Sequence, residues 1–171
     1  MITRDELLAS LEHETLLCKH LFSRLPDRAL DYRPAPGMRT TLELLRYLSF
    51  APLGFAKVVA VSNAFFGGDW SGFHKEQKRT AAMPSEGFPA EMDRQMEGFR
   101  TLLKGIPEEK FVTQQLVPPW GTNRTLGALL IDLCLKTLVA YRMQLFLYAK
   151  QAGNSNLNTG DCWAGVHYED S

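Results

Sequence analysis

The longest periodic segment of this chain runs from Thr125 to Gln151 and stops before Gly153. Polar and charged side chains such as Asp132 and Lys136 fall outside its apolar stripe. Steps of three and four residues place side chains on one face of a helix. The residues that recur at these steps are Leu126, Leu130, Leu133, Thr137, Tyr141, Gln144 and Tyr148. The pattern predicts a long helix whose Thr137 and Tyr141 point inward.

Three further segments show the same period and carry helix-capping residues. A capping box pairs a Ser or Thr with a Glu three residues later, and Thr3 with Glu6 and Thr40 with Glu43 have this spacing. The predicted helices span residues 4–24, 41 to the glycine pair at 67–68, and 89–105.

The second predicted helix contains Pro52, which we expect to kink it near Phe50. Proline lacks the amide hydrogen that a helix needs and crowds the preceding turn. The inward stripe of this helix consists of Leu44, Tyr47, Leu48, Ala51 and Phe55. Tyr47 is therefore predicted to face the interior.

Four helices without a clear run of strands predict an all-α protein folded as a four-helix bundle. The 171 residues suit one domain, predicted over 1–171. Between the second and third helices, residues 67–87 show no period, and we expect a long loop that acts as a lid over a pocket. The tail from residue 154 onward is expected to be irregular.

Charge and apolar content exclude some partners. The 19 basic and 19 acidic residues cancel, so no net field would gather nucleic acid. Charges interrupt the N-terminal segment where a signal peptide would need apolar residues, and no apolar run approaches the ~20 residues of a membrane span. We therefore expect a cytoplasmic protein without nucleic-acid or membrane partners. Cys18 and Cys134 lie in apolar helical patterns and are predicted to be buried.

The run LPDRALDYRPAPGMRTTLELLRYLS, residues 25–49, is similar to the linker and second helix of the DinB/YfiT-like superfamily. Arg142 and the pair Gln144-Leu145 resemble the end of the last helix in that family. The resemblance implies a bundle with up-down-down-up connections, often paired as a homodimer. It also implies a divalent metal held by three histidines, used to activate a thiol or water. In this chain those positions are Tyr47, Thr137 and Tyr141.

These three residues are poor metal ligands. Imidazole binds first-row divalent metals well, whereas Thr and neutral Tyr hydroxyls bind them poorly unless deprotonated. We therefore expect no metal and no cofactor at this position. The hydroxyls can instead pair with one another in a packed core, or line a small-molecule pocket. Tyr47, Thr137 and Tyr141 are accordingly the candidate ligand-binding residues.

Other functions stay open at this stage. His13, His20 or His74 could rebuild a metal or acid-base site, which would leave a metal- or thiol-dependent transferase or hydrolase with a relocated active site. A third alternative is a structural homodimer without a ligand. The sequence identifies no catalytic residue, and it leaves open whether the protein is an enzyme. The leading hypothesis is a DinB-like protein that binds a small molecule without a metal.

Overall fold

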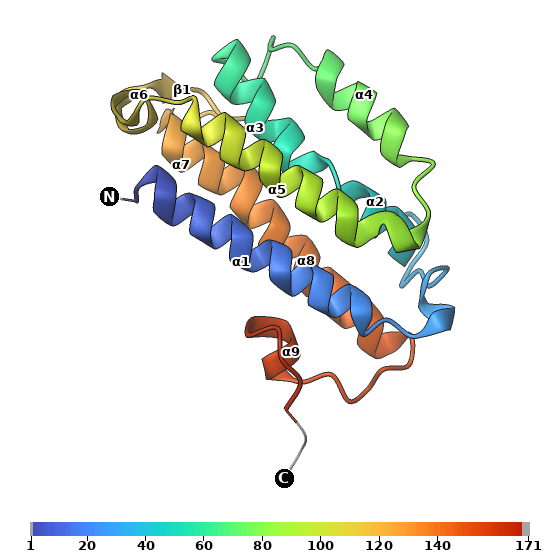
Figure 1. Cartoon of the computed structure of the whole chain (residues 1–171). Helices are drawn as coiled ribbons and strands as arrows, with labels where there is room; N and C mark the ends of the chain where they lie inside the picture. The colour runs from blue at the N-terminus through green and yellow to red at the C-terminus, as the bar shows by residue number, and fades with distance from the viewer. Residues whose placement is uncertain (1, 169–171) are drawn as a thin grey trace.

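The computed structural model describes residues 2–168, and most of them are helical (Figure 1), which confirms the all-α prediction. The helices are α1 (Arg4–Ser23), α2 (Thr41–Leu48), α3 (Ala51–Ser62), α4 (Ser71–Thr80), α5 (Phe88–Lys104), α6 (Glu108–Thr113), α7 (Leu126–Leu130), α8 (Lys136–Gln151) and α9 (Thr159–Trp163). A π-helical turn, Ile131–Leu135, joins α7 to α8. Two short strands, β1 (Gln115–Leu116) and β2 (Arg124–Thr125), pair antiparallel.

The helices enclose a hydrophobic core to which α1, α2, α3, α5, α7 and α8 all contribute. Helix α1 packs against α5 and α8, α2 packs against α8, and α3 packs against the π-helical turn and α5. Figure 1 shows α1, α5 and the α7–α8 segment running side by side. Cys18 and Cys134 are fully buried, as predicted, and burial raises the pKa of both thiols.

Both predicted capping boxes are present. The Thr3 side chain accepts a hydrogen bond from the Glu6 amide, and the Glu6 carboxylate accepts one from the Thr3 amide. Thr40 and Glu43 make the same reciprocal pair at the start of α2. Each box satisfies amide groups that the first helical turn leaves without partners.

Three sequence-based boundaries are wrong. The segment expected to be a loop between 67 and 87 contains α4, whose Phe73 and Thr80 face the protein at helical spacing. The second long helix ends at Ser62, because Asn63 adopts a left-handed conformation with φ of 53° that terminates α3. The tail contains α9 and is irregular only around it, and residues 169–171 lie outside the described part.

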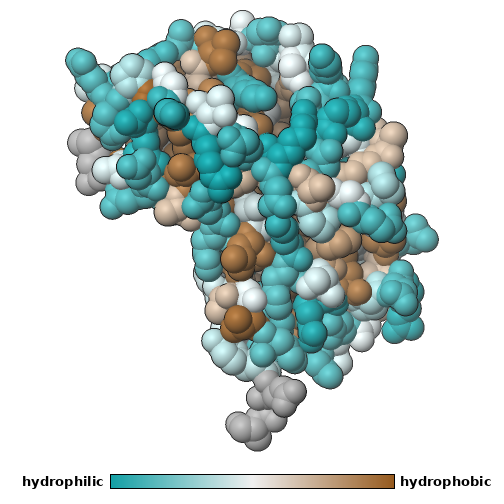
Figure 2. Space-filling view, in the orientation of Figure 1, coloured by the Kyte–Doolittle hydropathy of each residue, from teal (hydrophilic) through white to brown (hydrophobic). Residues whose placement is uncertain are grey.

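The segment Thr41–Ser62 is long and apolar enough to cross a membrane by length and composition, contrary to the expectation that no such run exists. However, 67 % of its most apolar window is buried inside the protein, which is typical of a core helix in a soluble protein. The face in Figure 2 is mostly hydrophilic, with hydrophobic side chains in small separate patches. Cytoplasmic localisation stays a prediction.

The expected interruption at Pro52 is present, since α2 ends at Leu48 and α3 begins at Ala51. Pro52 has no amide hydrogen to give to the Leu48 carbonyl, which lies four residues earlier. The side chain of Gln95, on α5, fills this gap: its Nε2 donates to the Leu48 carbonyl at 2.9 Å. Its Oε1 accepts from the Leu53 amide at 3.2 Å. Gln95 is 3 % exposed, so one buried amide replaces the missing helical hydrogen bonds and ties α5 to the break.

A buried ion pair holds a second junction. Arg142 of α8 is fully buried and donates from Nε to Glu14 of α1 at 2.6 Å. Its Nη1 donates to the Cys162 carbonyl of α9 at 2.7 Å. A single guanidinium therefore joins α1, α8 and α9, and removing one member of such a pair leaves an uncompensated buried charge.

Replacing Gln95 with Leu should destabilise the protein by about 2 kcal/mol, because the Leu48 carbonyl and the Leu53 amide lose buried partners. In a Pro52→Ala background the cost should fall by about 1 kcal/mol, since residue 52 regains the amide that normally bonds this carbonyl. Urea unfolding of the four members of this double-mutant cycle measures both values. Equal costs of Gln95→Leu in the two backgrounds would contradict this role for Gln95.

Candidate functional site

Two of the three predicted ligand-binding residues meet in the structure. The rings of Tyr47, on α2, and Tyr141, on α8, pack edge to face with centroids 5.0 Å apart. The Arg39 guanidinium lies 4.0 Å from the centre of the Tyr47 ring and 5.6 Å from that of Tyr141. A cation over an aromatic face is a favourable contact. Tyr47 and Tyr141 therefore form an aromatic pair covered by a cation.

Thr137 has a different role from the two tyrosines. Its hydroxyl donates to the Leu133 carbonyl one turn earlier at 2.6 Å, so its only hydrogen-bond donor is used within its own helix segment. Thr137 and Tyr141 are both partly buried, and they occupy the same side of the last long helix, as their spacing predicts.

The residues at these positions do not fit the metal that the DinB/YfiT resemblance implies. Burial raises the pKa of Tyr47 to about 12, and the adjacent Tyr141 adds to this, while Arg39 acts in the opposite direction. A phenol with such a pKa stays protonated at neutral pH and does not supply the anionic oxygen that a metal would need. The Thr137 hydroxyl is also a neutral oxygen, and its proton is donated to the Leu133 carbonyl. Which ligand, if any, these residues contact stays a prediction.

The histidines make other contacts. His20 Nε2 lies 2.8 Å from Asp161 Oδ1, and His167 Nδ1 lies 2.7 Å from Asp161 Oδ2. His13 Nε2 lies 3.2 Å from the Trp163 carbonyl. The contacts of His20 and His13 dock α9 onto α1, and the contact of His167 holds the residues after α9 against it. Among residues 2–168, no group of three or more His, Cys, Asp or Glu side chains is placed to hold a metal ion.

Asp161 is the centre of this docking contact. Its side chain is completely buried, and it also accepts from the Asn158 amide at 2.9 Å to cap α9. Burial alone would raise the pKa of Asp161, but the hydrogen bonds from Asn158, His167 and His20 hold it below its ordinary value. Asp161 is therefore a charged anchor for α9. The contact with α1 has no local signal in the sequence, because His20 lies 141 residues from Asp161 in the chain.

His74 lies on α4 instead of in a flexible lid. The residue is exposed, its ring packs against Phe73 at a centroid distance of 5.8 Å, and Nδ1 lies 3.5 Å from Gln77 of the same helix. The structure thus brings His74 into contact with its own helix.

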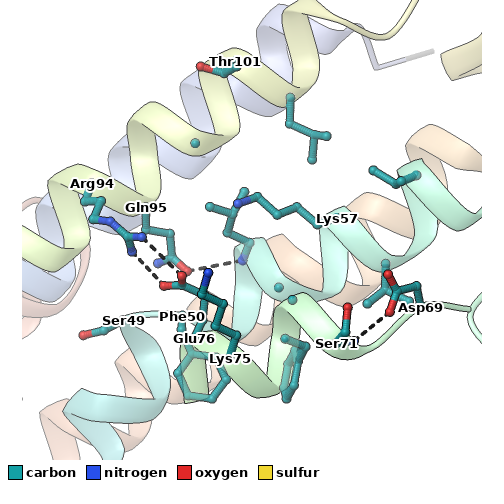
Figure 3. Close-up of a pocket in the computed structure, with 18 of the residues that line it drawn as sticks. Ser49, Phe50, Lys57, Asp69, Ser71, Lys75, Glu76, Arg94, Gln95 and Thr101 are labelled. Atoms are coloured by element: carbon teal, nitrogen blue, oxygen red, sulfur yellow. Dashed lines mark hydrogen bonds and ion pairs between the residues drawn. The ribbon is translucent and has the colours of Figure 1, made fainter. Parts of the chain in front are cut away.

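A cleft of about 730 Å³ lies between α3, α4 and α5 (Figure 3), in the range typical of small-molecule sites. Its apolar wall consists of Phe50, Leu53, Val58, Val61, Phe73 and Leu102. The segment that the sequence suggested as a lid over a pocket forms one wall of this cleft, as helix α4.

Helix α4 is held over α3 by an aromatic cluster. Phe73 of α4 stacks on Phe55 of α3 with centroids 5.2 Å apart, and it contacts Phe50 edge to face at 5.1 Å. Trp70 packs against both Phe55 and Phe73. At Gly54 a Cβ atom would lie 2.6 Å from the Phe73 ring, so the close approach of α4 to α3 requires glycine there.

Ion pairs hold α4 to α5 on the other side of the cleft. Glu76 of α4 accepts from Arg94 of α5 at 2.8 Å, and Arg79 of α4 pairs with Glu91 of α5 at 2.6 Å. The hydrogen bond from Arg94 is the main reason that the pKa of Glu76 falls to about 2, with Arg79 helping and partial burial opposing. The Glu76 carboxylate is therefore ionised at neutral pH and forms ion pairs with both Arg79 and Arg94.

The cleft residues were missed by sequence reasoning. The residues of α4 lie in the segment expected to be a loop, although Phe73, Glu76 and Thr80 follow the three- and four-residue steps of a helix face. No comparable signal identifies Gln95, which looks like any polar residue of an amphipathic helix. No protein-family model and no curated protein sequence matches the chain.

Tyr47 should ionise near pH 12, well above the ordinary tyrosine pKa of 10.0. Because the folded protein favours the neutral phenol, its stability should fall as the pH rises from 10 to 12, when unfolded Tyr47 would release its proton first. The difference in tyrosinate absorbance between the parent and Tyr47→Phe, measured against pH, gives the pKa of Tyr47. Replacing Tyr141 with Phe should lower this pKa. Ionisation of Tyr47 at its ordinary pKa would contradict this description of the aromatic pair.

Proposed function

We propose that this protein binds a small organic molecule in the cleft between α3, α4 and α5. The observation that carries the proposal is the cleft itself, because it combines an apolar wall with polar and charged side chains that can orient a small molecule. Aromatic packing fixes α4 to α3 and ion pairs fix it to α5, so the walls are held from both sides. A preformed cleft spares a ligand the cost of ordering its site.

We further propose that the chain is a four-helix bundle of the DinB/YfiT-like type, with α1, the α2–α3 pair, α5 and the α7–α8 segment as its four members. The contacts of α1 with α5 and α8, and of the α2–α3 pair with α8 and α5, support this arrangement. The meeting of Tyr47 with Tyr141 supports the alignment with the metal-binding relatives, since two of the three aligned positions lie together. Homodimer formation is part of the same proposal.

On this proposal Tyr47 and Tyr141 form an aromatic contact at the position where the relatives bind a metal. The ligand binds instead in the cleft between α3, α4 and α5. The tyrosine pair and Arg39 occupy the place that histidines fill in the relatives. The cleft begins next to the tyrosine pair and extends along α3, because Phe50, which lines it, packs against the Tyr47 ring at a centroid distance of 5.8 Å.

Replacing Tyr47, Thr137 and Tyr141 together by His should create a metal site. If the alignment is right, the three imidazoles converge and bind Zn²⁺ or Ni²⁺ at one ion per chain, whereas the parent binds neither there. Metal analysis after gel filtration measures the stoichiometry. A control that places His at 47 and 141 and at exposed Ala140 instead of 137 should bind more weakly. A folded triple variant that binds no metal would argue against the DinB/YfiT-like alignment.

The neutral dye Nile red should bind the parent at one site, because the cleft offers an apolar wall regardless of ligand charge. Gly72 lines the cleft, and a Cβ added there meets no atom within 4 Å, so Gly72→Leu should narrow the cleft without disturbing the fold. We expect about a ten-fold loss of dye affinity, measured by fluorescence titration.

Ala81→Leu is the matched control, since it adds an apolar side chain at an exposed position just after α4. It should leave dye binding unchanged. Equal dye binding by the parent and both variants, or no saturable binding at all, would refute ligand binding in this cleft.

A further inference from the structure

The charges around the cleft are not all compensated. Six charged residues line it: Lys57, Asp69, Lys75, Glu76, Arg94 and Glu97. Glu76 and Arg94 neutralise one another within the α4–α5 ion-pair network, and Glu97 pairs with Arg100 at 3.2 Å. The charges that remain are two lysines and one aspartate.

The two lysines lack carboxylate partners. Lys57 projects from α3 and Lys75 from α4, and within residues 2–168 no carboxylate lies within 4.0 Å of either ammonium group. In Figure 3 the side chain of Lys57 extends into the cleft toward the part next to Gln95. Cationic groups therefore border the cleft from two of its three helices.

Asp69 lies at the other end of the cleft. Its carboxylate accepts from the Ser71 amide at 2.8 Å at the start of α4, and Figure 3 shows this pair away from Gln95, Glu76 and Arg94. Hydrogen bonds from Ser71 hold the pKa of Asp69 below its ordinary value, so it is ionised at neutral pH. The cleft thus has an acidic end at Asp69, and Figure 3 shows Lys57 away from it.

We infer that the ligand is an amphipathic organic carboxylate whose anionic group is held by Lys57 and Lys75 while its apolar body lies along Leu53, Phe73 and Leu102. This inference rests on the proposed function, because it specifies which molecules the same cleft takes. The ammonium groups have no competing partner, and the arginine that could form a bidentate pair is already occupied by Glu76. The apolar wall supplies most of the area in contact with the ligand, and the lysines favour a negatively charged head group over a neutral or positively charged one.

Octanoate, 1-octanol and octyltrimethylammonium share a chain and differ in the charge of the head group, so they test the inference. Isothermal titration of the full chain at low ionic strength should show octanoate binding about ten-fold more tightly than 1-octanol, and octyltrimethylammonium binding least tightly. Lys57→Gln and Lys75→Gln should each weaken octanoate binding about three-fold, a size usual for partly exposed charges. Neither should change 1-octanol binding.

Lys78→Gln removes the same charge from α4 at an exposed position that does not line the cleft, and it should leave octanoate binding unchanged. If 1-octanol binds as tightly as octanoate, or the lysine variants bind octanoate like the parent, the carboxylate inference is wrong while ligand binding in the cleft stands. If none of the three amphiphiles binds, or if Gly72→Leu leaves their binding intact, the proposed function itself fails.

Discussion

The interruption of the helix at Pro52 is the constraint on which the rest of the site depends. Without the proline, the chain from Thr41 to Ser62 could continue as one helix, and the Leu48 carbonyl would need no partner from elsewhere. Because the partner is Gln95, the break fixes the position of α5 relative to α3. The cleft begins at this junction, and α4 then covers it through Phe73. The helix break at Pro52 therefore forms one end of the cleft between α3, α4 and α5.

The buried charges stabilise the opposite side of the molecule. Arg142 joins Glu14 to the backbone of α9, and Asp161 binds His20 and His167. Such groups are costly to bury, so the contacts are retained only where each partner is correctly placed. They make the C-terminal segment part of the fold. Two of the histidines that could have rebuilt a metal site, His13 and His20, hold α9 on α1 instead.

The sequence predicts those features that depend on neighbouring residues. The capping pairs at Thr3 and Thr40, the burial of Cys18 and the break at Pro52 all follow from local chemistry. Helix α4 could not be predicted because Phe73 is the only large apolar side chain among its polar and charged residues. The role of Gln95 could not be predicted because its partners lie 42 and 47 residues away in the chain. The contact of Asp161 with α1 could not be predicted either, because His20 lies 141 residues away. The facing of Tyr47 and Tyr141 was predicted, whereas whether they bind a ligand stays a prediction.

The central claim is that the cleft between α3, α4 and α5 is the ligand site, and NMR of glycine-labelled protein tests it most directly. Gly54, Gly72 and Gly98 line the cleft, whereas Gly37, Gly121 and Gly153 do not. Titration with octanoate should shift the amide signals of the first three glycines together, with one dissociation constant, and leave the last three in place. Shifts confined to glycines outside the cleft, or no saturable shift at any glycine, would contradict the account.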